Sequence, residues 1–96
     1  MPDRECAKSI AHKIVREKLA ACCNIVPGIT SVYTWQDKIN EDDELLLIIK
    51  SNSANFELLK ETIISKHPYD VPEVISIDIT EGSKDYLNWI DENVRK

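Results

Sequence analysis

The chain has 96 residues, so residues 1–96 are expected to form a single domain with one core. The formal net charge of −5 offers no basic stripe for phosphates, which argues against nucleic acid as a partner. No apolar run approaches the about 20 residues of a membrane span, and the beginning of the chain lacks signal-peptide architecture. Three cysteines, an odd number, argue against a disulfide framework and favour reduced thiols in the cytoplasm.

The first half of the chain predicts one helix followed by two strand segments. From Arg4 to Leu19 apolar residues recur at helical spacing, with Asp3 as N-cap. Ala20–Val26 has the character of a strand, Pro27-Gly28 of a bend or bulge, and Ile29–Trp35 of the strand's continuation. The helical apolar residues are Ala7, Ile10, Ala11, Ile14, Val15 and Leu19.

A polar turn is expected over Gln36–Asp43, and a strongly apolar strand over Glu44–Lys50. The acidic run Glu41-Asp42-Asp43-Glu44 lacks the spacing and the glycine of an EF-hand loop, so it predicts a solvated hairpin tip. A second helix is expected from about Ala54 to Lys66, with Ser53 available as its cap. The inward residues of this helix are Phe56, Leu59 and Ile63.

Val74–Ile79 alternates between apolar and polar residues and predicts another strand. A last helix follows at about Ser83–Val94. The order helix, strand, strand, helix, strand, helix predicts an α+β fold. Specifically, it is that of a ferredoxin-like sandwich, βαββαβ with an added C-terminal helix, from which the opening central strand is missing. Without that strand, the strands on either side of it would have unpaired backbone N–H and C=O groups, unless another segment pairs with them.

The stretch from Ser65 to Glu73 connects the second helix to this strand and carries a cluster of functional groups. Pro68 and Pro72 hold it extended, because each proline fixes its own φ and disfavours helix at the preceding residue. The imidazole of His67, the phenol of Tyr69 and the carboxylates of Asp70 and Glu73 are therefore expected at fixed geometry. Such a connection favours a role in binding a ligand or meeting a partner.

Five blocks of sequence, in this order, resemble the CutA family of small trimeric proteins linked to divalent-cation tolerance. The blocks are Glu17-Lys18-Leu19-Ala20-Ala21-Cys22-Cys23-Asn24-Ile25-Val26-Pro27-Gly28-Ile29-Thr30-Ser31, Tyr33-Thr34-Trp35, Ile49-Lys50, His67-Pro68-Tyr69 with Pro72-Glu73, and Tyr86-Leu87-Asn88-Trp89. The resemblance runs over essentially the whole chain. It implies a homotrimer that binds divalent metal such as copper and takes part in metal tolerance.

The chain departs from the family pattern at two places. Family members normally begin with an apolar, cysteine-bearing strand that ends in a Thr-Ala-Pro-Asp-like turn, and here Met1-Pro2-Asp3 stands at that turn. Some members have two histidines before the Pro-Tyr pair, and here the first of these positions is Lys66. A metal site built from that cysteine and both histidines would keep only His67.

His67 is the candidate metal ligand, and Glu73 is a weaker one. Each has a structural alternative: His67 as the end of a helix stopped by Pro68, and Glu73 as a hydrogen-bonding group at a strand start. One imidazole and scattered carboxylates predict only weak binding of Cu²⁺ or another divalent cation. The residues expected at an interface or pocket are Tyr33, Trp35, Tyr69, Glu73 and Trp89.

Glu44–Lys50 is apolar on both faces, and helices cover only one face of a ferredoxin-like sheet. The hairpin from Ala20 to Lys50 is therefore expected to form an interface, with Tyr33 and Trp35 in it. The uncovered apolar face predicts only an oligomer. That it has three subunits is implied by the family resemblance. No nucleophile has an evident activating base, so no enzyme is predicted. Two alternatives stay open: a small-molecule-binding regulatory module, and a trimeric scaffold that anchors or assists another protein.

Overall fold

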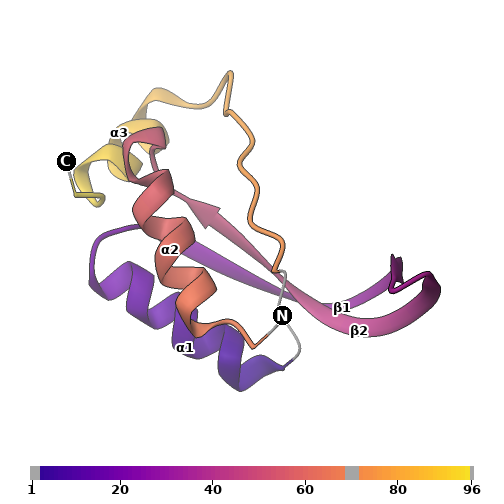
Figure 1. The fold of residues 1–96 in the computed structure, drawn as a ribbon. Helices are drawn as coiled ribbons and strands as arrows, with labels where there is room; N and C mark the ends of the chain where they lie inside the picture. Colours follow the sequence, from indigo (N-terminus) through magenta and orange to yellow (C-terminus); the bar gives the residue numbers. More distant parts are fainter. Residues whose placement is uncertain (1–2, 69–71, 96) are drawn as a thin grey trace.

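A computed structural model describes residues 3–68 and 72–95. In chain order its elements are α1 (Arg4–Arg16), β1 (Cys22–Trp35), β2 (Lys38–Lys50), the short 3-10 helix η1 (Ser53–Asn55), α2 (Phe56–Lys66) and α3 (Lys84–Glu92). The α+β composition is as predicted. Both α1 and α2 lie on one side of the β1–β2 hairpin, whose outer half extends beyond the helices as an arm (Figure 1). The molecule is correspondingly elongated, with extents of 45 × 26 × 21 Å.

Helix α1 begins where the sequence predicted, because the Asp3 carboxylate accepts a hydrogen bond from the Cys6 N–H at 2.7 Å. It ends at Arg16, three residues before the predicted end. Lys18 has a φ of 59°, a left-handed conformation that cannot continue the helix. Of the apolar residues at helical spacing in α1, Val15 has an exposed side chain.

The core joins α1 and α2 to the base of the hairpin. Ile10 and Ile14 from α1 meet Leu59 and Ile63 from α2, and Leu19 closes the cluster. Half-buried side chains of the strands pack against it from the other side. These are Cys23, Leu47 and Ile49, joined by Val74. One face of the hairpin base is therefore used for the core, which leaves its opposite face for other contacts.

The segment that follows α3 is attached to this body by hydrogen bonds at Arg95. The Arg95 N–H donates to the Lys18 carbonyl at 2.8 Å, and the buried Asn55 amide donates to the Arg95 carbonyl at 2.7 Å. Asn52, not the predicted Ser53, caps the entry to the second helical segment, by accepting from the Asn55 N–H. The last helix is shorter than predicted and ends at Glu92.

The second strand of the hairpin is longer than predicted. The hairpin turn is only Gln36 and Asp37, both with positive φ (52° and 62°), as a tight two-residue hairpin requires. The predicted polar turn Gln36–Asp43 is wrong, because the ladder runs on through Lys38. The acidic residues therefore lie in β2, not at a hairpin tip. The predicted bulge at Pro27-Gly28 is confirmed, since the register shifts between Val26 and Ile29 and Gly28 has a φ of 77°.

The predicted strand Val74–Ile79 is not formed. Residues 72–83 adopt no regular secondary structure, and the sheet among the described residues is the two-stranded β1–β2 hairpin. A strand requires a neighbour for its backbone groups, and the neighbour that the ferredoxin-like order expects beside this segment is the opening central strand. Among residues 3–68 and 72–95, no helix has the length and hydropathy that crossing a membrane requires.

Candidate functional site

A groove of about 260 Å³ lies between β2 and the segment after α2, and we call it the apolar groove. Its walls are the hairpin on one side and the segment at residues 73–75 on the other, with α2 contributing from its C-terminal half. Two of the predicted site residues, His67 and Glu73, line it together. The remaining lining residues are Ile29, Ser31, Glu44, Leu45, Leu46, Leu47, Ile49, Ile63, Val74 and Ile75.

His67 is placed in the groove by the end of α2. It is the C-cap residue, and its backbone N–H donates to the Ile63 carbonyl at 2.9 Å. Partial burial lowers the pKa of the imidazole, and the Glu44 carboxylate acts against this by favouring the charged form. The lowered pKa keeps the ring neutral at pH 7, which is the form that can ligate a metal.

Glu44 is a site residue that the sequence analysis missed as such. It was assigned to the acidic run at the start of β2, and its side chain acts on His67 from a separate element. No local pattern signals this electrostatic influence, because the two residues line the same groove only through the tertiary fold. Glu73, in contrast, is exposed at the groove's opposite wall. The groove thus combines an apolar floor with one imidazole and two carboxylates.

The predicted aromatic residues lie elsewhere. Tyr33 and Trp35 are exposed on the outer half of β1, where the Tyr33 hydroxyl donates to the Asp42 carboxylate. Trp89 is exposed on α3 and stacks on Tyr86 with ring centroids 5.8 Å apart. Tyr69 lies outside the described residues. The predicted site residues therefore lie in three separate places. His67 and Glu73 line the apolar groove, Tyr33 and Trp35 lie on the hairpin, and Trp89 lies on α3.

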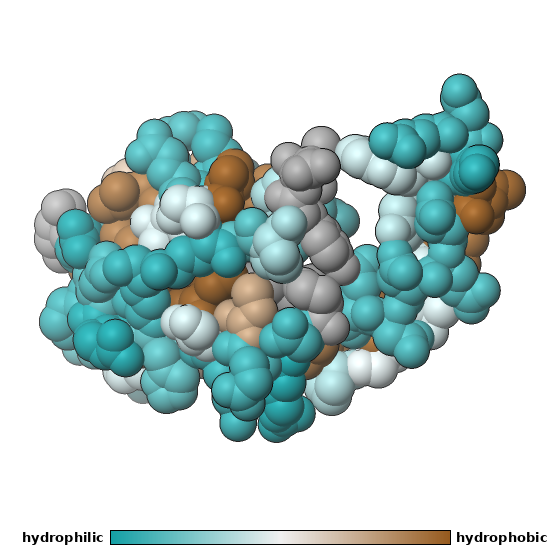
Figure 2. Space-filling model, turned by 60° about the horizontal axis from the view of Figure 1, so that its bottom comes forward, coloured by the Kyte–Doolittle hydropathy of each residue, from teal (hydrophilic) through white to brown (hydrophobic). Residues whose placement is uncertain are grey.

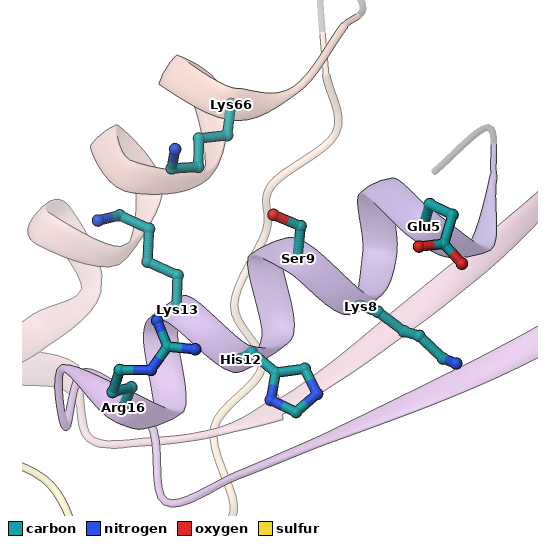
Figure 3. A pocket seen from close by; sticks show the side chains of 7 residues that line it. All are labelled: Glu5, Lys8, Ser9, His12, Lys13, Arg16 and Lys66. Carbon is teal, nitrogen blue, oxygen red and sulfur yellow. The ribbon is translucent and has the colours of Figure 1, made fainter.

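A second depression, on α1, has polar and mostly basic walls (Figure 3). Its side chains diverge: Lys13 and Lys66 extend on one side of the helix pair, while Lys8 and His12 point to the other. Lys13 is moreover paired with Glu17 at 2.5 Å. His12 is exposed. Side chains that point apart provide no common centre for a ligand, and we assign no function to this depression.

The three cysteines are free thiols. Cys22 and Cys23 follow one another on β1, and Cys23 packs against the core. Burial, together with the neighbouring Cys22, raises the pKa of the Cys23 thiol to about 11. Since the thiolate is both the nucleophile and the metal ligand, Cys23 is inert at neutral pH.

The raised pKa of Cys23 has a measurable consequence. At pH 8 we expect iodoacetamide to alkylate Cys23 of the folded protein far more slowly than free cysteine, because almost none of the thiol is ionised. The rate should rise with pH until about pH 11. Peptide mass spectrometry of timed, quenched samples measures it, with a denatured sample as the control. Labelling of Cys23 as fast in the folded as in the denatured sample would contradict this account.

The comparisons with known proteins agree on one family. The family model described as CutA1 divalent ion tolerance protein matches residues 1–93. The divalent-cation tolerance protein CutA of Thermus thermophilus is 50% identical over 93 residues, covering 97% of this chain and 90% of the relative. The chloroplastic protein CutA of Arabidopsis thaliana is 53% identical over 95 residues, covering 99% of this chain. The chain spans 52% of the length of that plant relative.

Solved structures extend the agreement to the fold. The T. thermophilus divalent cation tolerance protein superposes with a TM-score of 0.96 at 48% identity, over 99% of this chain and 92% of that one. CutA1 of Oryza sativa superposes with a TM-score of 0.97 at 47% identity, over 100% of this chain and 88% of that one. The α+β arrangement is therefore that of solved CutA1 proteins. By sequence and by fold, the chain belongs to the CutA1 divalent ion tolerance family.

Proposed function

We propose that this protein binds divalent cations, copper among them, weakly and exchangeably, and that it acts in metal tolerance as a homotrimer without catalysing a reaction. The observation that carries the proposal is the family match over residues 1–93. The apolar groove supplies candidate ligands, because His67, Glu44 and Glu73 all line it. Imidazole nitrogen and carboxylate oxygen are both ligands for divalent transition metals.

The ligand set does not fit a tight metal site. Within residues 3–68 and 72–95, no three or more histidine, cysteine, aspartate or glutamate side chains lie close enough together to hold a metal ion. A tight site uses three or four protein ligands. Cys23 cannot help, since its thiol stays protonated at neutral pH. The remaining ligands are His67 and one of the carboxylates of Glu44 and Glu73. Two ligands support only weak binding of a divalent cation.

Copper titration tests the metal part of the proposal. We expect isothermal calorimetry of the wild type with Cu²⁺ to give a dissociation constant weaker than about 1 µM, corresponding to less than about 8 kcal/mol. His67→Ala should weaken it further, because the imidazole is lost. His12→Ala is the matched control: it removes the other histidine, which is exposed on α1, and should change nothing.

Two results of that titration would contradict the metal proposal. One is sub-micromolar binding of one copper per subunit that survives His67→Ala, which would place the site elsewhere. The other is equal loss of binding in His67→Ala and His12→Ala, which would indicate unspecific coordination by surface imidazoles. Either result leaves the family assignment intact.

The hairpin supports the trimeric part of the proposal. Its arm carries apolar side chains with no cover inside the chain: Val32 is 66% exposed, Ile39 80% and Trp35 43%. Leu46 and Ile48 are exposed on the far side of β2 from the core. In the space-filling view most of the arm is hydrophilic, and one apolar patch lies at its outer edge (Figure 2). An edge of this kind aggregates unless a closed assembly covers it.

A binding role, rather than catalysis, is supported by the two histidines. His12 is exposed among lysines on α1, and His67 faces Glu44 and apolar side chains. Neither arrangement presents a nucleophile beside a base, which covalent catalysis needs. The free thiols support a reducing compartment such as the cytoplasm as its location.

A further inference from the structure

The exposed face of α1 carries a row of basic residues, which we call the basic row. It consists of Arg4, Lys8, His12 and Arg16, which follow one another at i, i+4 spacing and therefore lie along one ridge of the helix. All four residues are exposed. Lys8 and His12 extend on the same side of α1 (Figure 3).

The charge of α1 is opposite to that of the whole chain. The chain has a formal net charge of −5, whereas α1 contains four basic residues and one acidic residue. Lys13 is paired with Glu17. Within residues 3–68 and 72–95, no ion pair involves Arg4, Lys8 or Arg16. The positive charge of the basic row is therefore not compensated within the described part of the chain.

The basic row does not serve the stability of the helix. Arg4 and Lys8 are like charges at i, i+4, and such a pair destabilises a helix. Arg4 also lies in the first turn, where the positive end of the helix dipole disfavours a cation. A negative charge brought by a partner offsets both costs. The basic row is therefore suited to an acidic partner.

The geometry of α1 favours an elongated partner over a small ion. The side chains around the depression on α1 point apart, so they cannot enclose one ion, but an elongated partner contacts them in turn. The thirteen residues of α1 extend over about 20 Å. A second helix laid along α1 matches the basic row when its acidic residues recur at every fourth position. Val15, which is 40% exposed and three residues from His12, adds an apolar contact.

Membranes and nucleic acids fit the basic row less well than a single helix does. Both present phosphates over a surface larger than α1, and outside α1 the acidic residues of the chain outnumber the basic ones, which repels such a surface. Among the residues of α1, all of which the structure describes, Val15 is the one exposed large hydrophobic residue. A helix that lies in a membrane interface needs a broad apolar face.

From these observations we propose that the basic row binds an acidic helix of a partner protein, with aspartate or glutamate at every fourth position. The charges orient the partner and speed the encounter. Because the ion pairs are exposed to solvent, binding is weak and depends on salt. The basic row shares no residue with the apolar groove or the hairpin arm, so this proposal stands apart from those on metal and on the trimer.

A synthetic acidic helix tests this with the whole chain. The probe is a fluorescein-labelled, alanine-based peptide of about 16 residues with glutamate at every fourth position, held helical by a hydrocarbon staple on its other face. Fluorescence anisotropy at about 50 mM salt should show saturable binding of one peptide per chain. Binding should weaken at least tenfold at about 500 mM salt, where the charges are screened. A stapled peptide of the same composition with its glutamates out of this spacing should bind at least fivefold more weakly.

Protein variants locate the binding. The double variant Lys8→Glu with Arg16→Glu reverses two charges of the basic row and should weaken binding at least tenfold. The matched control is Lys38→Glu with Lys84→Glu, which changes the net charge equally at exposed positions of β2 and α3 and should bind within about twofold of the wild type. Circular dichroism melting checks the fold. If the reversal unfolds the protein, Lys8→Gln with Arg16→Gln replaces it and should still weaken binding.

Three outcomes would overturn the proposal. The first is no saturable binding of the acidic helix at low salt. The second is equal weakening in the two charge-reversal variants, or equal binding of the two peptides, because net charge alone would then explain the attraction. The third is tighter binding of duplex DNA or of phosphatidylserine vesicles than of the peptide, lost in the variant of Lys8 and Arg16, which would make the basic row a phosphate-binding surface.

Discussion

We expect that replacing Trp35 by alanine and Ile39 by aspartate together dissociates the proposed homotrimer into monomers at micromolar concentration. The two residues lie on paired strands beside the hairpin turn, Trp35 opposite Lys38 and Ile39 opposite Thr34, and both are exposed in the single chain. Buried aromatic anchors in an interface contribute about 2 kcal/mol or more each, and a buried unpaired carboxylate adds a further penalty. Association should weaken at least about 100-fold, which size-exclusion chromatography with light scattering measures.

Ile64→Asp is the matched control for this experiment. Ile64 is 45% exposed, close to the value for Trp35, but it lies on α2 and away from the hairpin. This variant should keep the wild-type mass. If the double variant assembles like the wild type, or if Ile64→Asp dissociates while the double variant does not, the hairpin is not the interface.

We expect Ile14→Ala to destabilise the protein far more than truncation of an exposed residue of the same helix. Ile14 is fully buried at the centre of the cluster between α1, α2 and the hairpin base. Truncation of a buried isoleucine costs about 2–5 kcal/mol, as lost transfer energy plus the cavity that remains. We expect about 3 kcal/mol in urea unfolding, measured at one fixed protein concentration because assembly adds to the apparent stability.

Val15→Ala serves as the control for Ile14→Ala. It is the next residue of the same helix, but its side chain is exposed, so its truncation should cost less than about 1 kcal/mol. Similar losses in the two variants would show that α1 does not pack against α2 and the hairpin through the face described above.

The helices could be predicted from the sequence because their signals are local. The Asp3 cap, the spacing of Ile10 and Ile14 on α1, and the pair Leu59 and Ile63 on α2 each depend on residues within one helix. The predicted ends of the helices are less accurate, because contacts with residues far away in the sequence determine where a helix ends. Lys18 adopts its left-handed conformation beside a C-terminal segment that hydrogen-bonds to it, and no local pattern contains that information.

The strands were harder to predict, for two different physical reasons. Residues 38–43 are mostly polar and resemble a turn, yet they pair with β1 because the two-residue turn at Gln36 and Asp37 starts the ladder at Lys38. Val74–Ile79 has a strand's alternation but lacks a neighbour, and pairing is a property of two segments. The site shows the same limit: His67 was found from its own motif, whereas Glu44 reaches it only through the packing of α2.

Native mass spectrometry of the wild-type protein at low micromolar concentration tests the central claim most directly, namely that the exposed hairpin closes a homotrimer. The interface expected for such an obligate assembly buries at least about 2,000 Å². We expect a single species of three times the 11.0 kDa chain mass. A stable, soluble monomer at that concentration would contradict it.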